Sequence, residues 1–89
     1  MKKDLVRRER VRLGKFLAKK REEKGMSQGE VAKKLGYSSP QFISNIERGK
    51  CSPALSSAKK MAKLYDIPPA NMQAELVSVE VAKVSEAFQ

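Results

Sequence analysis

The stretch SQGEVAKKLGYSSPQFISNIERGK, residues 27–50, decides the fold, because it predicts two short helices joined by a tight turn. Ser27 stands three residues before Glu30 as a capping box, and Ser39 before Pro40 is the predicted start of the second helix. Gly36 marks the break between the two helices. Apolar residues at helical spacing give each helix one face to bury: Val31, Ala32 and Leu35, then Ile43 and Ile46. Two helices packed at an angle are how a protein holds one of them out toward a DNA groove.

The second of these helices exposes polar side chains that suit base recognition. Gln41, Ser44 and Asn45 fall away from the apolar face. Gln and Asn amides pair with adenine in a major groove through two hydrogen bonds, and hydroxyl groups pair with either kind of base edge. We therefore expect these three residues to read bases, the alternative being that they are simply exposed polar positions.

Charge is distributed unevenly along the 89-residue chain. It contains 19 Lys and Arg against 10 Asp and Glu, a net charge of +9. Residues 1–63 hold 18 basic and six acidic side chains, whereas residues 64–89 hold one basic and four acidic. A basic body attracts polyanions through counterion release, so double-stranded DNA is the expected partner, with a membrane surface as the rival.

The composition argues against several kinds of site. The chain has no histidine and a single cysteine, Cys51, so a Cys/His zinc site and an internal disulfide are excluded, and no metal or cofactor is expected. Without histidine there is no imidazole base and no Ser-His or Cys-His nucleophile, which argues against an enzyme. Cys51 is interpreted as a small apolar loop residue rather than a redox switch. The sequence shows no run of 18 apolar residues and no secretory signal, so we expect a cytoplasmic, nucleoid-associated protein without a membrane contact.

The first helix is predicted from about Asp4, as its N-cap, to Lys24, with Gly25 as its stop. Its first part, residues 1–12, is crowded with Lys and Arg and is either a helical extension or a basic arm. One interpretation is a solvated charged face. The other, which we favour, is contact with the DNA backbone by residues such as Arg8 and Arg12, because basic N-terminal arms reach DNA grooves in homeodomains.

A fourth helix is predicted from Ser52, as N-cap, and Pro53, as first residue, to about Tyr65. Its buried face is expected to hold Leu55, Ala58, Met61, Ala62 and Tyr65. The prolines of Asp66–Pro69 end this helix, and a fifth segment follows from Pro69.

The fifth segment fits two patterns. Apolar residues recur at spacings of four and three, as in a heptad seam: Ala70, Ala74, Val77, Val81, Val84 and Phe88. Alternation of valines with polar residues over 77–81 is instead typical of a strand. We favour a helix, because helix formers surround the valines and a lone strand would have no partner in the chain. The apolar stripe either packs on the chain's own core or, as we prefer, forms a homodimer contact through Val77, Val81, Val84 and Phe88.

Three stretches of the chain resemble the helix-turn-helix family of phage repressors and Cro, which includes bacterial regulators of the xenobiotic-response-element type. They are LGKFLAKKREEKGMSQGEVAKKLGYS at 13–38, ISNIERGKCSP at 43–53 and LSSAKKMAKLYDIPPANM at 55–72. The resemblance implies an all-α, compact five-helix DNA-binding domain over residues 13–72. Residues 1–12 precede it as the basic segment, and residues 73–89 follow as the amphipathic segment. The resemblance also implies operator binding, usually as a two-fold dimer, with the third helix in the major groove.

The functional residues of the family map onto matching positions of this chain. Gln28 corresponds to a glutamine that contacts a phosphate and braces the recognition helix. Phe42 stands where a side chain can touch a thymine methyl group. Arg21 and Glu47 correspond to a buried ion pair that ties the first helix to the third. The base-facing positions of the family fall on Gln41, Ser44 and Asn45.

The loop after the third helix is where the resemblance places contacts with the DNA backbone. Arg48, Lys50 and the amides around Gly49 match a loop that grips phosphates, and Ser39 is assigned to the same class of contact. The turn departs from the family pattern, because it holds one extra residue, which we place at Ser38–Pro40. We therefore expect an altered entry of the third helix into the groove.

The expected function is sequence-specific DNA binding by a transcription regulator, by default a repressor that occludes its operator as a homodimer. Two alternatives share the fold. One is a DNA-binding antitoxin whose C-terminal segment binds a protein partner, for which a second protein would co-purify. The other is a bridging factor that binds proteins, for which no specific DNA site would be found.

Overall fold

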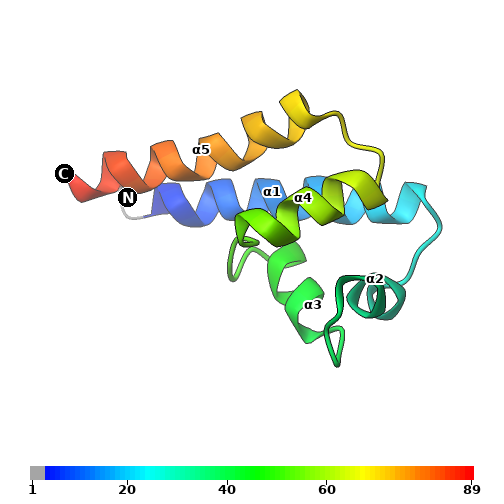
Figure 1. The fold of residues 1–89 in the computed structure, drawn as a ribbon. Helices are drawn as coiled ribbons and strands as arrows, with labels where there is room; N and C mark the ends of the chain where they lie inside the picture. The colour runs from blue at the N-terminus through cyan, green and yellow to red at the C-terminus, as the bar shows by residue number, and fades with distance from the viewer. Residues whose placement is uncertain (1–3) are drawn as a thin grey trace.

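The chain folds into five α-helices, without a strand, over residues 4–89, the part that the computed structural model describes (Figure 1). In chain order they are α1 (Leu5–Glu23), α2 (Gln28–Leu35), α3 (Gln41–Glu47), α4 (Leu55–Leu64) and α5 (Pro69–Ala87). The expected compact all-α five-helix fold is confirmed. Residues 1–3 of the basic N-terminal segment lie outside the described residues, whereas residues 5–12 form the first turns of α1.

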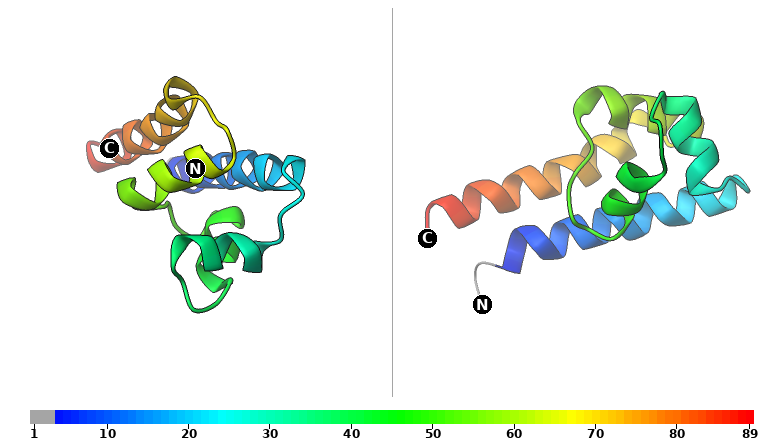
Figure 2. Two further views of the ribbon diagram at one scale, coloured as in Figure 1. Left: turned by 45° about the vertical axis from the view of Figure 1, so that its right-hand side comes forward. Right: turned by 90° about the horizontal axis from the view of Figure 1, so that it is seen from below.

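The two longest helices, α1 and α5, run side by side in opposite directions (Figures 1 and 2). Each contains 19 residues, and the first turn of α1 lies beside the last turn of α5. Of the shorter helices, α3 packs on α1, α2 packs on α3 and α4, and α4 also contacts α5. Side chains from all five helices share one core: Leu13, Leu17, Val31, Ala32, Ile43, Ile46, Ala58, Met61, Ala62, Tyr65, Ile67, Met72, Val79 and Ala82.

The N-terminus of α1 is capped from the far end of the chain. Asp4 occupies the N-cap position, as predicted, but its side chain makes no capping hydrogen bond. The backbone N–H of Val6 instead donates to Oε2 of Glu86 in α5, at 2.9 Å. A carboxylate at this position satisfies a free N–H group of the first turn and interacts favourably with the helix dipole. The contact therefore ties the first turn of α1 to the last turn of α5.

Local signals set the bounds of α2. The hydroxyl of Ser27 accepts a hydrogen bond from the backbone N–H of Glu30 at 3.0 Å, and the Glu30 carboxylate accepts one from the N–H of Ser27 at 2.8 Å. These two bonds confirm the predicted capping box. Gly25 and Gly36, the predicted stops of the first two helices, have φ angles of 68° and 86°, in the left-handed region that favours glycine.

The predicted starts of the third and fourth helices were wrong by one and two residues. α3 begins at Gln41 with Pro40 as its N-cap, because the Pro40 carbonyl accepts the first helical hydrogen bond, from Ser44, at 2.9 Å. α4 begins at Leu55 with Ala54 as its N-cap, for the same reason. In both cases the serine–proline pair forms the approach to the helix rather than its first turn.

Leu55 is the exception to the predicted buried face of α4. Its side chain is 79% exposed, so the expectation that it lies in the core was wrong. Because α4 starts later than predicted, Leu55 is its first residue and projects beyond the packed part of the helix. Together with Met72 and Leu76 it lines an apolar groove between α4 and α5.

Residues 73–87 continue the helix that begins at Pro69, so the prediction of a helix rather than a strand is confirmed. The face with Val79 and Ala82 is buried. The opposite face carries Val77, Val81, Val84 and Phe88, which are 55–87% exposed. We call these four residues the α5 stripe. The alternative in which the stripe packs on the chain's own core is therefore wrong.

Candidate nucleic-acid interface

The candidate interface centres on α3, which is held on its buried face and at its C-terminal end. Ile43 and Ile46 are completely buried and join the core that Val31 of α2 and Leu17 of α1 also enter. Gly14 of α1 lies so close to α3 that a Cβ atom added to it would be 2.5 Å from the Ile46 carbonyl oxygen. The orientation of α3 relative to α1 and α2 is therefore fixed by packing.

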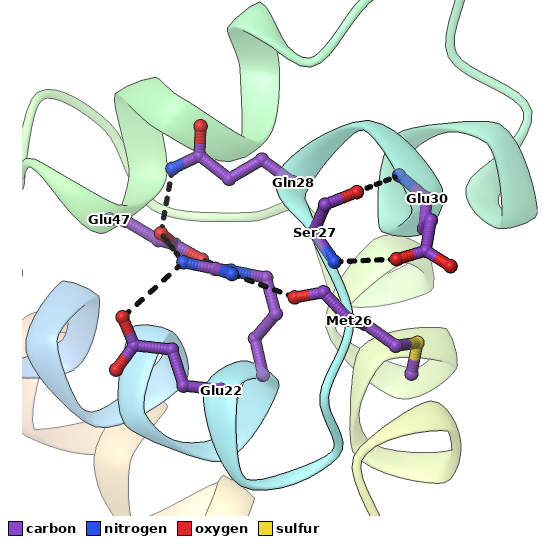
Figure 3. Close-up of polar contacts among 7 residues, drawn as sticks. Glu22, Met26, Ser27, Gln28, Glu30 and Glu47 are labelled. Carbon is purple, nitrogen blue, oxygen red and sulfur yellow. Dashed lines mark hydrogen bonds and ion pairs between the residues drawn. The ribbon is translucent and has the colours of Figure 1, made fainter.

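An ion pair between Arg21 of α1 and Glu47 of α3 adds a polar tie beside this packing (Figure 3). Nε of Arg21 donates to Oε2 of Glu47 at 2.7 Å, and a terminal nitrogen donates to Oε1 at 3.0 Å. The other terminal nitrogen donates to the Met26 carbonyl at 2.8 Å. Only 12% of the Arg21 side chain and 6% of the Glu47 side chain are exposed. The hydrogen bonds to Glu47 raise the pKa of Arg21 above its ordinary value, so the guanidinium stays protonated.

Gln28, at the start of α2, makes contact with the same carboxylate. Its amide nitrogen donates to Oε1 of Glu47 at 2.8 Å, and the side chain is half-buried (Figure 3). This contact braces α2 against the end of α3, which is one of the two roles expected for Gln28. The amide nitrogen keeps one further hydrogen for the second expected role, a contact with phosphate.

The outer face of α3 carries a connected group of polar side chains. The carbonyl oxygen of the Asn45 side chain accepts hydrogen bonds from the Gln41 amide at 2.9 Å and from the Arg48 guanidinium at 3.3 Å. Gln41 and Arg48 are exposed, and Ser44 and Asn45 are half-buried. The structure thus brings Arg48, which was assigned to the loop after α3, onto the face of the base-reading candidates. Amides and a guanidinium on the outer face of one helix are groups that hydrogen bond with base edges.

The loop after α3 lies against α1, a contact that sequence reasoning missed. Gly49 is buried with φ of 79°, and a Cβ atom on it would be 2.6 Å from Cγ2 of Val11. The backbone N–H of Lys50 donates to the backbone carbonyl of Asn45 at 2.9 Å, while the Lys50 side chain is exposed. This loop therefore has a defined conformation beside the outer face of α3. A glycine here was the available signal, but nothing in the sequence pointed to Val11.

Comparison with known proteins identifies this arrangement. A family model described as helix-turn-helix matches residues 17–71, which is more than half of the chain. The chain belongs to the helix-turn-helix family. This family is of the Cro and repressor type, which includes xenobiotic-response-element regulators. No curated protein and no solved structure matches the chain significantly. Membership implies a DNA-binding transcription regulator rather than an enzyme.

The turn of the helix-turn-helix unit projects into solvent. Ser38, Ser39 and Pro40 are all exposed, and Figure 1 shows the connection between α2 and α3 protruding beyond both helices. Within residues 4–89, the one hydrogen bond of the Ser39 hydroxyl is a long one, accepted from the backbone N–H of Gln41 at 3.4 Å. Ile43 remains buried, so the apolar face of α3 lies against the core although the turn before it is exposed.

The remaining site candidates of the helix-turn-helix protein are Phe42 in α3 and two arginines in α1, Arg8 and Arg12. Phe42 is half-buried and packs on Tyr37, with ring centroids 4.7 Å apart, so its ring is partly occupied within the chain. Arg8 and Arg12 are exposed on α1, and Arg12 forms an ion pair at 3.6 Å with Glu9, whose side chain is half-buried. Such surface pairs contribute little to stability, so Arg12 can exchange its partner for a phosphate.

Membrane and metal sites were also sought over the described part of the helix-turn-helix protein. None of its helices has both the length and the apolar character needed to cross a bilayer. Residues 4–89 likewise contain no group of three or more His, Cys, Asp and Glu side chains arranged to hold a metal ion.

Proposed function

We propose that the protein regulates transcription by sequence-specific DNA binding, with α3 in the major groove. The observation that carries this proposal is the outer face of α3, where the side chains of Gln41, Asn45 and Arg48 form one hydrogen-bonded polar group. The helix that presents them is held by the buried Arg21–Glu47 pair and by close packing on Gly14. Rigid elements position base-reading side chains more accurately than loops do.

Contacts with the DNA backbone surround this reading face. Gln28 at the start of α2, Ser39 in the turn, and Lys50 in the loop after α3 are the proposed phosphate contacts of the helix-turn-helix unit. Arg8 and Arg12 extend the contacts along α1. With a net charge of +9, the protein should lose affinity steeply as salt increases, because each neutralised phosphate releases a counterion. Such contacts fix the register of the protein on DNA without reading its sequence.

The proposed active form is a homodimer that binds a two-part operator and represses by occlusion. Val77, Val81, Val84 and Phe88 support it, because four large apolar side chains on one exposed helix face are unusual for a soluble monomer. Their spacings of four and three match the seam of paired helices. A two-fold dimer would present two copies of α3 to half-sites separated by about one turn of DNA.

Sedimentation of the full chain tests the dimer. Val81→Asp combined with Val84→Asp should convert a dimer into a monomer, because charges would be buried in the seam. The matched control is Leu55→Asp, which alters an exposed apolar residue outside the α5 stripe and should leave the mass unchanged. If the wild-type protein is a monomer and co-purifies with another protein, the result would favour an antitoxin that binds a protein partner over a homodimer.

Selection from random duplex DNA tests the function. The recovered sites should share one motif made of two symmetry-related halves. Gln41→Ala should then lose about 1–3 kcal/mol of binding free energy on the selected site and little on random DNA. Equal losses on both kinds of DNA would contradict reading of bases by α3, and the absence of any enriched site would favour a bridging protein.

A further inference from the structure

The two polar atoms of the Asn45 side chain differ in how many hydrogen bonds they make within residues 4–89. Its side-chain carbonyl oxygen accepts from the Gln41 amide at 2.9 Å and from the Arg48 guanidinium at 3.3 Å. A carbonyl oxygen has two lone pairs, so these two donors use its capacity as an acceptor. The amide nitrogen of Asn45 still has hydrogens to donate. Asn45 therefore faces outward as a donor only.

Adenine requires more than a donor. In the major groove it presents the N7 acceptor and the N6 amino donor, and an amide pairs with both only if its nitrogen donates and its oxygen accepts. Asn45 lacks a free acceptor while the group is intact. The sequence-based expectation that both Gln41 and Asn45 can pair with adenine therefore holds for only one of the two side chains.

Gln41 keeps both functions. Its amide nitrogen has two hydrogens, of which one is donated to Asn45, and its carbonyl oxygen accepts no hydrogen bond within residues 4–89. Its side chain is exposed at the first turn of α3. Residues four apart on a helix lie on the same face, so Asn45 holds the Gln41 amide from one turn further along. An amide held in one orientation before binding loses less freedom when it meets a base.

We propose that Gln41 is the adenine-reading residue of α3 and that Asn45 is a positioning residue, which orients Gln41 and Arg48. The inference rests on the proposed function, because it requires α3 to lie in the major groove. It assigns different roles to two amides that the sequence presents as equivalent.

The test measures the base preference of variants at every position of the selected site. Gln41→Ala should abolish a preference for adenine at one base pair of each half-site, a loss of roughly 5-fold to 150-fold in discrimination. Asn45→Ala should weaken the preference at that same base pair, and the double variant should discriminate no worse than Gln41→Ala alone. These outcomes follow if Asn45 acts through Gln41.

Asn45→Asp separates positioning from a merely structural role. A carboxylate still accepts from both neighbours, so the adenine preference should persist, while affinity for every duplex falls because a negative charge approaches the phosphates. Gln73→Ala, at an exposed glutamine of α5, is the matched control and should change neither quantity.

Two results would overturn the inference. One is that Asn45→Ala removes a preference at a different base pair and leaves the Gln41-dependent one intact, since Asn45 would then read a base itself. The other is that Asn45→Asp loses the preference as completely as Gln41→Ala. Selection with the wild-type protein tests the proposed function separately: if no DNA site is enriched, the proposed function itself fails. If a site is enriched but the variants behave in either of these two ways, only the roles assigned to Gln41 and Asn45 are wrong.

Discussion

Gly14 provides a sharp test of how closely α1 and α3 pack. A methyl group at this position would lie 2.5 Å from the Ile46 carbonyl oxygen and 2.6 Å from that of Glu47. Both neighbours are backbone atoms, which cannot rotate away as a flexible side chain would. Gly14→Ala therefore requires α1 and the end of α3 to separate, in an interior that is otherwise closely packed.

The magnitude follows from two opposing terms. Overpacking a core typically costs about 1–3 kcal/mol, and a clash with backbone places this variant at the upper end. Alanine regains up to about 1 kcal/mol through its higher helix propensity. The free energy of unfolding should therefore fall by about 2 kcal/mol, a large fraction of the stability of a small domain. DNA binding should weaken too, because the displaced segment ends the proposed recognition helix.

Urea unfolding followed by circular dichroism measures the loss, and Gly29→Ala is the matched control. A Cβ atom on Gly29, in α2, would meet only the Ser27 hydroxyl, at 3.8 Å. The control should therefore be neutral or stabilising by up to about 1 kcal/mol. If Gly14→Ala proved as stable as this control, the close approach of α1 to α3 would be refuted.

Individual polar groups give four more predictions. Tyr37→Phe should lower the free energy of unfolding by about 1 kcal/mol, because it removes the 2.6 Å hydrogen bond between Tyr37 and Ser57. Tyr65→Phe should be neutral or stabilising, because the buried Tyr65 hydroxyl has no partner within residues 4–89. Urea unfolding compares the two variants. Burial also raises the pKa of Tyr65 to about 12. Stability should therefore fall as the pH rises past 10.0, where tyrosine ionises in the unfolded chain. Tyr65→Phe should remove the share of this pH-dependent loss that Tyr65 causes. Glu86→Ala should cost about 0.5–1 kcal/mol and speed hydrogen exchange at Val6; unchanged exchange there would argue against the cap. The hydrogen bond from the Ser27 backbone lowers the pKa of Glu30 below its ordinary value of 4.5. The Glu30 carboxylate therefore stabilises the fold above pH 4.5, and this stabilisation is lost on acidification. The free energy of unfolding of Glu30→Gln should accordingly fall less than that of the wild type as the pH is lowered through this range.

Local features of this fold could be predicted from sequence because their causes are local. The capping box of Ser27 and Glu30 needs only a spacing of three residues, and the left-handed glycines at 25 and 36 mark helix ends without tertiary information. The Arg21–Glu47 pair was found differently, through resemblance to a family, since 26 residues separate its members. Helix starts near proline were misjudged because both Pro40 and Pro53 suit a first turn as well as the loop before it.

Other features depend on contacts that no local pattern encodes. Val6 and Glu86 are 80 residues apart, and only the antiparallel packing of α1 on α5 brings them together. The proximity of Gly49 to Val11 also arises from a crossing of two segments that are distant in sequence. At the candidate site, sequence identified the polar face of α3, but the unequal roles of Gln41 and Asn45 depend on which oxygen accepts which hydrogen.

The ratio of two dissociation constants tests the central claim, that α3 makes this protein a sequence-specific DNA binder. Both are measured at one salt concentration, for the selected duplex and for a scrambled duplex of equal length and composition. Specific recognition predicts tighter binding to the selected duplex by a factor of about 10³ or more. A ratio near one would contradict it, because attraction between a basic surface and phosphates would then account for all of the binding.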